Sequence, residues 1–170
     1  YMGQALRERW PEIFAHDLFF AHGSQGSYTL FPWLLGLSFD WIDPPNAFLW
    51  GSLAAILLFA AAGWYCLSGL LPKGQRYWAW LGVLCLPSMY GRTIIFSYHE
   101  PFLTPRPIAE SLCLLAIGLL ARGRYALAIA SLACAGVFHP LQAIAAILII
   151  WPWLVMQDRR WLHAVWGAIP

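Results

Sequence analysis

The first side chain that could do chemistry is Asp17, which lies within an otherwise apolar segment near the start of the sequence. We expect a helix from Pro11 to His22, and a helical wheel places Asp17 in the middle of its apolar face. A carboxylate held over an apolar surface could act as a general base or bind a cation. The alternative is an interfacial Asp bonded to a neighbour such as His16.

A second group of candidates lies in the polar segment 97–107. His99 and Glu100 could bind a divalent metal such as Mg²⁺ or Mn²⁺, or orient a substrate group, or be solvated in a loop. The guanidinium fork of Arg106 is suited to phosphate. Because Glu110 follows four residues later, an ion pair within one helix is the alternative for Arg106.

Two more candidates interrupt apolar runs. Arg92 lies near the end of one such run, where a charge is costly in lipid, so it either binds a phosphate or extends to the headgroups. His139 precedes Pro140 at a predicted helix break. It could bind a phosphate or a carboxylate, or satisfy carbonyl groups that the break leaves free.

The composition indicates the environment of these residues. Hydrophobic residues make up 61% of the chain and charged residues 11%, against about 25% in soluble domains. A chain of 170 residues has too little interior to bury several wholly apolar helices, so lipid must surround them. The net charge of +2 comes without a long basic tract, which argues against nucleic acid. The four cysteines lie apart in apolar runs, as buried hydrophobes do.

We therefore expect an all-α fold, a multi-pass transmembrane helical bundle that forms one membrane domain over residues 1–170. Residues 1–46 form an outer loop with interfacial helices at Pro11–His22 and Tyr28–Phe39, and Asn46 is the expected N-cap of the first span. The expected transmembrane helices are 47–71, 77–98, 108–121, 125–138 and 141–156, and 161–170 begins a further helix. Both ends of the sequence look cut, so we expect a fragment of a longer protein.

The orientation follows from three basic turns, at Lys73/Arg76, at Arg122/Arg124 and at Arg159/Arg160. The positive-inside rule puts all three on one side only if His139-Pro140 divides residues 125–156 into a hairpin of two short helices. Residues 1–46, the loop 97–107 and the hairpin tip then share the outer side.

This order of elements resembles the GT-C fold glycosyltransferases, polytopic enzymes that use lipid-phosphate sugars, and among them the divergent bacterial members. The similar features are Asp17 in a long first outer loop, the following segment with Pro32, Tyr98-His99-Glu100 in the second outer loop, Arg106-Pro107 with a carboxylate at Glu110, and a hairpin tip at His139. The sequence departs from the family in lacking a clear Asp-x-Asp motif and in having His rather than Lys or Arg at the tip.

The resemblance implies a multi-pass protein of the bacterial inner membrane that transfers a sugar from a polyprenyl-phosphate donor, with inversion, at the outer face. Asp17 would be the base. Arg92, Arg106 and His139 would stabilise the phosphate, and His99 and Glu100 would orient the donor or hold a metal. The rival interpretation is a non-catalytic polytopic protein for lipid handling, transport or assembly. The sequence leaves the sugar, the acceptor, the metal and the oligomeric state open.

Overall fold

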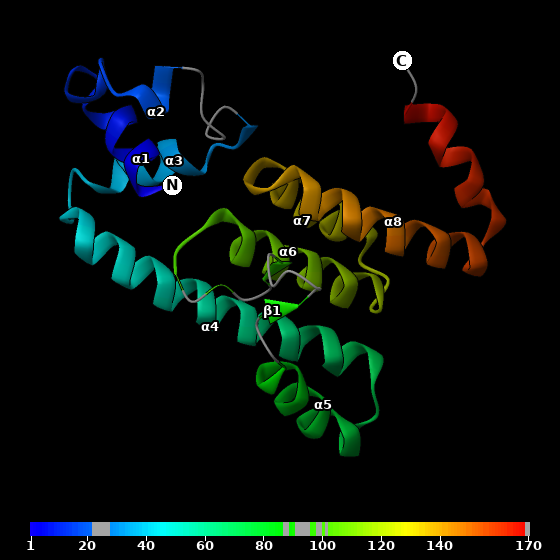
Figure 1. The fold of residues 1–170 in the computed structure, drawn as a ribbon. Coiled ribbons are helices and arrows are strands. Elements are labelled where there is room, and N and C mark those ends of the chain that lie inside the picture. Colours follow the sequence, from blue (N-terminus) through cyan, green and yellow to red (C-terminus); the bar gives the residue numbers. More distant parts are fainter. Residues whose placement is uncertain (22–27, 87–88, 91–95, 98–99, 101, 169–170) are drawn as a thin grey trace.

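The computed structural model describes residues 1–21, 28–86, 89–90, 96–97, 100 and 102–168, and apart from one pair of two-residue strands its regular elements are helical. In chain order (Figure 1) these are α1 (Met2–Arg9), η1 (Pro11–Phe14), α2 (Leu18–Ala21), α3 (Phe31–Ser38), α4 (Pro44–Leu70), α5 (Lys73–Cys85), β1 (Met89–Tyr90), β2 (Phe96–Ser97), α6 (Pro105–Leu120), α7 (Tyr125–Phe138), α8 (Pro140–Gln157) and η3 (Arg159–Ala168).

Helices α4 and α6 lie side by side and run in the same direction (Figure 1). Glycines lie where the two segments approach each other closely. A Cβ atom added to Gly118 would lie 2.9 Å from the Cα atom of Cys66. One added to Gly69, near the end of α4, would lie 2.5 Å from Nη1 of Arg122. Glycine thus allows the two backbones to touch, as small residues do between membrane helices.

Helices α7 and α8 form an antiparallel hairpin that turns at His139 and packs on α6. The side chain of His139 caps α8, and Pro140 occupies the first helical position, where a missing N–H costs nothing. The core between α6 and the hairpin contains small residues such as Ala128, Ala135 and Ala143, and the Ser131 hydroxyl donates to a carbonyl of α6. The helix break therefore lies where the charge pattern requires it.

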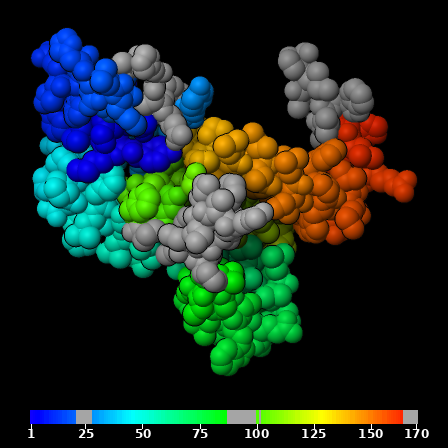
Figure 2. Space-filling model, viewed as in Figure 1, coloured from blue at the N-terminus to red at the C-terminus, as the bar shows by residue number. Residues whose placement is uncertain are grey.

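The described residues between Tyr1 and Asp40 form an N-terminal block of short helices at one end of the bundle (Figure 2). Its core contains Ala5, Phe31 and Leu35, and the Tyr1 ring meets Phe31 edge-on at 5.7 Å. The Thr29 hydroxyl donates to the Phe138 carbonyl at 2.6 Å. This hydrogen bond ties the block to the hairpin tip.

Two helices of the described residues, α4 and α8, are long and apolar enough to cross a membrane. Less than a third of the apolar window of each is buried in the protein, and their large apolar side chains are largely exposed. The 27 residues of α4 would extend about 40 Å at 1.5 Å per residue. A surface of this kind is costly in water and favourable in lipid.

Three expectations about helix bounds were wrong. A continuous helix over 77–98 is not formed: α5 ends at Cys85, and Leu86 is extended because it precedes Pro87 and α conformation is disfavoured there. The N-cap of α4 is Asp43, not Asn46, and its carboxylate accepts from the Asn46 N–H. The predicted helix from Pro11 to His22 is broken into η1 and α2, and the sequence interpretation missed α1.

Candidate functional site

The start of α6 holds an ion pair between two of the candidate residues. Arg106 donates through Nη1 to Oε1 of Glu100 at 2.8 Å, and the Thr104 hydroxyl donates to the other oxygen of Glu100. The Glu100 side chain is 9% exposed and that of Arg106 is 40% exposed. The carboxylate is therefore a buried anchor, and the guanidinium keeps further N–H donors for a ligand.

The predicted alternative of an Arg106–Glu110 pair is not formed. Oε1 of Glu110 instead accepts from Nε2 of Gln142 on α8, at 2.9 Å. Glu110 thus joins α6 to the hairpin, while Arg106 is left to Glu100. Arg106 therefore pairs with Glu100 in the loop rather than with Glu110 on its own helix. Thr104 holds the Glu100 carboxylate near the N-terminus of α6, where negative charge is favoured.

His139 has a defined protonation pattern. Its Nδ1 accepts the backbone N–H of Gln142 at 3.3 Å, so the proton of the neutral ring is on Nε2. Burial lowers the pKa of His139 below its usual value, nearby Arg106 lowers it further, and Glu100 acts in the opposite direction. A neutral His139 therefore presents a hydrogen-bond donor, and it has no free lone pair with which to act as a base.

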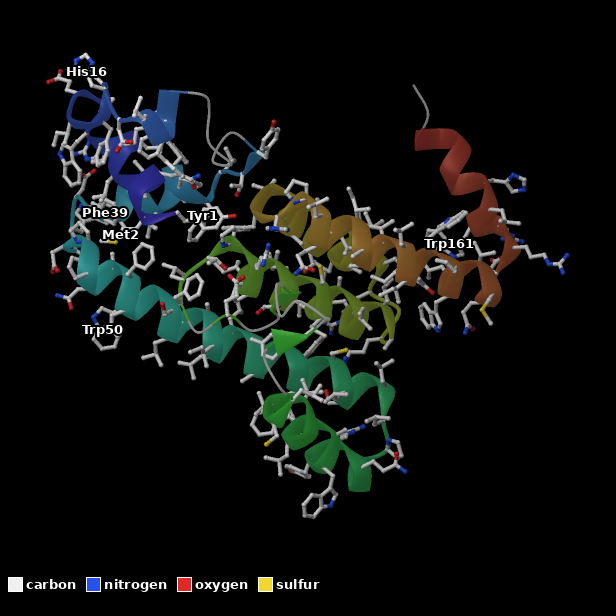
Figure 3. The ribbon with its side chains drawn as sticks, in the orientation of Figure 1. Tyr1, Met2, His16, Phe39, Trp50 and Trp161 are labelled. Carbon is white, nitrogen blue, oxygen red and sulfur yellow. The ribbon has the colours of Figure 1, made fainter. Side chains whose placement is uncertain are left out.

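Arg106 and His139 open onto one pocket of about 450 Å³ between the N-terminal block, α6 and the hairpin tip. Its lining consists of Tyr1, Tyr28, Thr29, Arg106, Phe138, His139, Pro140 and Leu141. Tyr1 points from the start of α1 toward the hairpin tip (Figure 3). Burial raises the pKa of the Tyr1 phenol, an effect that Arg106 opposes and Glu100 reinforces. Neutral phenol, imidazole N–H and guanidinium are all donors, so the pocket favours an oxygen-rich anion.

The sequence interpretation missed the tyrosines and Thr29. For Tyr1 no sequence signal existed. For Thr29 a signal did exist, because a Thr hydroxyl just before a helical segment often accepts from the backbone N–H two residues on. In the structure its hydroxyl accepts from the Phe31 N–H at 3.1 Å.

An apolar groove of about 450 Å³ lies beside this pocket, between α3, α4 and α6. It is lined almost wholly by carbon atoms of residues such as Leu35, Ala55 and Leu103. Phe138 lines both the groove and the polar pocket. A polar head and an apolar tail joined in one ligand would therefore meet a matching pair of surfaces.

The structure does not bring Asp17 to this pocket. Its side chain is exposed, and Oδ1 accepts from the Phe19 N–H at 2.8 Å, which caps the short helix α2. His16, the preceding residue, lies at the end of the N-terminal block away from Tyr1 (Figure 3). Asp17 was expected on an apolar helix face, and this was wrong because its carboxylate competes for backbone N–H groups and interrupts the helix.

Arg92 and His99 lie outside the described residues. Within the part of the chain that the structure describes, no three His, Cys, Asp or Glu side chains gather in a way that could hold a metal ion. Both oxygens of Glu100 accept hydrogen bonds, from Thr104 and Arg106, so a metal bound there would have to displace them.

Comparison of the sequence with protein-family models and with curated proteins, and of the fold with solved structures, found no match.

Proposed function

We propose that this chain is the membrane-embedded part of a GT-C-type glycosyltransferase that spans the bacterial inner membrane several times. It transfers a sugar from a polyprenyl-phosphate donor to an acceptor at the outer face, with inversion. The observation that carries the proposal is the shared wall at Phe138, where a pocket rich in hydrogen-bond donors meets an apolar groove. A lipid phosphate has the same two halves.

In this proposal the phosphate of the donor lies against Arg106 and Nε2–H of His139. Both donors face the pocket in fixed positions, Arg106 through Glu100 and His139 through the Gln142 N–H. Negative charge grows on the phosphate as the bond to the sugar breaks, and preorganised donors stabilise such charge without reorganising. The prenyl chain occupies the groove beyond Phe138.

The remaining step needs a base that takes the proton of the acceptor hydroxyl. Asp17 is the proposed base by resemblance alone, since its position draws no support from the pocket geometry. Asp17→Asn is a clean test because Asn caps a helix as well as Asp does. We expect the variant to reach the membrane normally and to lose sugar transfer. Retained transfer would remove Asp17 from the mechanism.

The phosphate half is tested by Arg106→Gln in the full-length protein, assayed in membranes with radiolabelled polyprenyl-phosphate sugars. Arg9→Gln is the matched control, because Arg9 also pairs with an acid, Asp40, but lies outside the pocket. We expect Arg106→Gln to lower transfer at least about a hundredfold, as the loss of a preorganised donor does. Equal losses in both variants would contradict the assignment.

The rival is a non-catalytic protein that binds and presents a lipid phosphate. The observation that favours it is the exposed position of Asp17, away from the pocket. Both proposals predict donor binding that depends on Arg106. They differ in turnover: a lipid-handling protein would bind the donor stoichiometrically and release it unchanged.

A further inference from the structure

The opposite end of the bundle holds a second arginine in a fixed position. Arg122 lies in the turn that follows α6, where its Nη1 donates to the Gly118 carbonyl and its Nη2 to the Ser68 hydroxyl on α4, each at 2.6 Å. The guanidinium carbon lies 3.9 Å from the centre of the Tyr65 ring. Gly69 leaves the space that the guanidinium occupies, since a Cβ there would lie 2.5 Å from Nη1.

The local structure explains why this side chain is held so firmly. Gly123, with φ of 70°, closes α6 in a left-handed turn in which the N–H groups of Gly123 and Arg124 return to carbonyls of the last turn. Arg122 lies within this turn, and its own N–H returns to the Leu119 carbonyl. The Ser68 hydroxyl donates to the Tyr65 carbonyl, so its lone pair is directed to Arg122.

The guanidinium of Arg122 has no carboxylate partner among the described residues. It has five N–H donors, of which two are used within the described part of the chain. The side chain is exposed, and the turns at this end hold six basic residues, including Lys73 and Arg124, against a single acid, Asp158. An exposed, preoriented fork with unused donors in a basic region suits a phosphodiester.

We propose that Arg122, held by Ser68 and Tyr65, binds the phosphodiester of an anionic phospholipid at the basic end of the bundle. α4 extends from this end as an apolar helix, so the acyl chains lie along its exposed face while the headgroup reaches the guanidinium. The remaining basic residues in these turns attract negatively charged lipid at long range, and Arg122 binds the headgroup directly. This proposal needs the chain to lie in a bilayer and does not depend on sugar transfer.

The test uses the full chain in detergent micelles and counts bound lipid by native mass spectrometry. The probes are dioleoylphosphatidylglycerol, dioleoylphosphatidylcholine, which has the same phosphodiester without net charge, and inorganic phosphate. We expect the glycerol lipid to bind at least about tenfold more tightly than the choline lipid, and phosphate not to displace it. Equal binding of both lipids, or displacement by phosphate, would overturn the proposal.

Two variants locate the site. Arg122→Gln removes the fork, and Gly69→Ala keeps the charge but pushes the guanidinium from its place. We expect each to weaken binding of the glycerol lipid about tenfold, the scale of one charge-assisted contact. Arg160→Gln is the control, because it removes one charge from the same end without touching this contact, and we expect less than about a twofold effect.

The same variants distinguish lipid binding from a simpler role of Arg122 as a clamp between α4 and α6. A clamp would make Arg122→Gln less heat-stable without changing its lipid affinity, and that result would overturn the proposal. A loss in Arg160→Gln as large as in Arg122→Gln would overturn it too, since binding would then be diffuse. If Arg122→Gln fails to fold, Gly69→Ala and Arg122→Lys carry the same comparison.

Discussion

Glu100 and Arg106 form an ion pair whose members differ sharply in burial, with 9% of the Glu100 side chain exposed and 40% of the Arg106 side chain. The acid is the fixed partner and the cation faces the pocket. A second ion pair, between Arg9 and Asp40, lies at the surface of the N-terminal block, with 45% and 36% of the side chains exposed. The two pairs therefore offer a matched comparison.

We expect Glu100→Gln to destabilise the protein by about 1–3 kcal/mol, because two bonds to a buried carboxylate become bonds to a neutral amide. Asp40→Asn removes the acid of the exposed pair and should cost less than about 1 kcal/mol. Thermal unfolding of each variant in the same detergent measures the difference. Equal midpoints for the two variants would show that Glu100 is not the buried anchor.

The stability of the hairpin should depend on pH through His139. Its pKa is lowered in the folded protein, so the unfolded chain binds the proton more readily. The contribution of His139 to the free energy of unfolding is therefore fully present above the ordinary His pKa of about 6.5. This contribution falls as the pH drops from there toward the folded-state pKa. His139→Asn keeps a capping side chain that does not titrate.

The measurement is the unfolding midpoint of both proteins between pH 7.5 and pH 5. We expect the wild type to lose more stability than His139→Asn across this range, because the other titrating groups contribute to both curves and cancel. The charged groups that face His139 in the described residues include Arg106, which lowers its pKa, and Glu100, which raises it. Parallel curves would show that His139 has the same pKa folded and unfolded.

The contact between α4 and α6 should not tolerate a side chain at Gly118. Its Cβ would meet the Cys66 backbone, which cannot move aside as a flexible side chain can. We expect Gly118→Ala to destabilise the protein by about 1–3 kcal/mol, as overpacking does. Gly82→Ala in α5 is the control, because a Cβ there meets nothing within 4 Å. It should be neutral or stabilise by up to about 1 kcal/mol.

Much of the helical pattern was predictable from the sequence because apolar runs and proline breaks determine it. The positive-inside rule, applied to the three basic turns, predicted the hairpin break at His139. The same reasoning failed where short-range hydrogen bonds decide the outcome. Asp17 caps α2 rather than lying on a helix face, and Asp43 rather than Asn46 caps α4. A side chain that can bond to its own backbone follows neither periodicity nor hydropathy.

The candidate site shows the same division. Glu100 pairs with Arg106 at the start of α6, and Arg106 and His139 line one pocket at this end of the bundle. The sequence pattern had placed Glu100 in the second outer loop, Arg106 at a helix end and His139 at a helix break. The contribution of Tyr1 could not be predicted, because it depends on how the N-terminal block packs against the hairpin. Side chains that come together through tertiary packing leave no spacing signal in the sequence.

The hairpin geometry leads to a prediction about topology. Helix α7 has 14 residues, or about 21 Å, and α8 has 18, or about 27 Å. Both are shorter than a hydrocarbon core of about 30 Å, so a hairpin that crosses the bilayer needs the bilayer to be thinned around it or other protein to cover its ends. The tip at His139 and the turn before α7 should nevertheless lie on opposite sides.

Single cysteines test this in a variant whose native cysteines are replaced by Ala. Leu141 lies beside the tip and is 72% exposed, and Arg124 is exposed at the start of α7. We expect Leu141→Cys to react with a membrane-impermeant maleimide in intact cells, and Arg124→Cys to react only after permeabilisation. The reverse pattern would move the Arg106 pocket to the inner face. Labelling of both from outside would mean that the hairpin does not cross the bilayer, which removes the lipid-phosphate proposal as well.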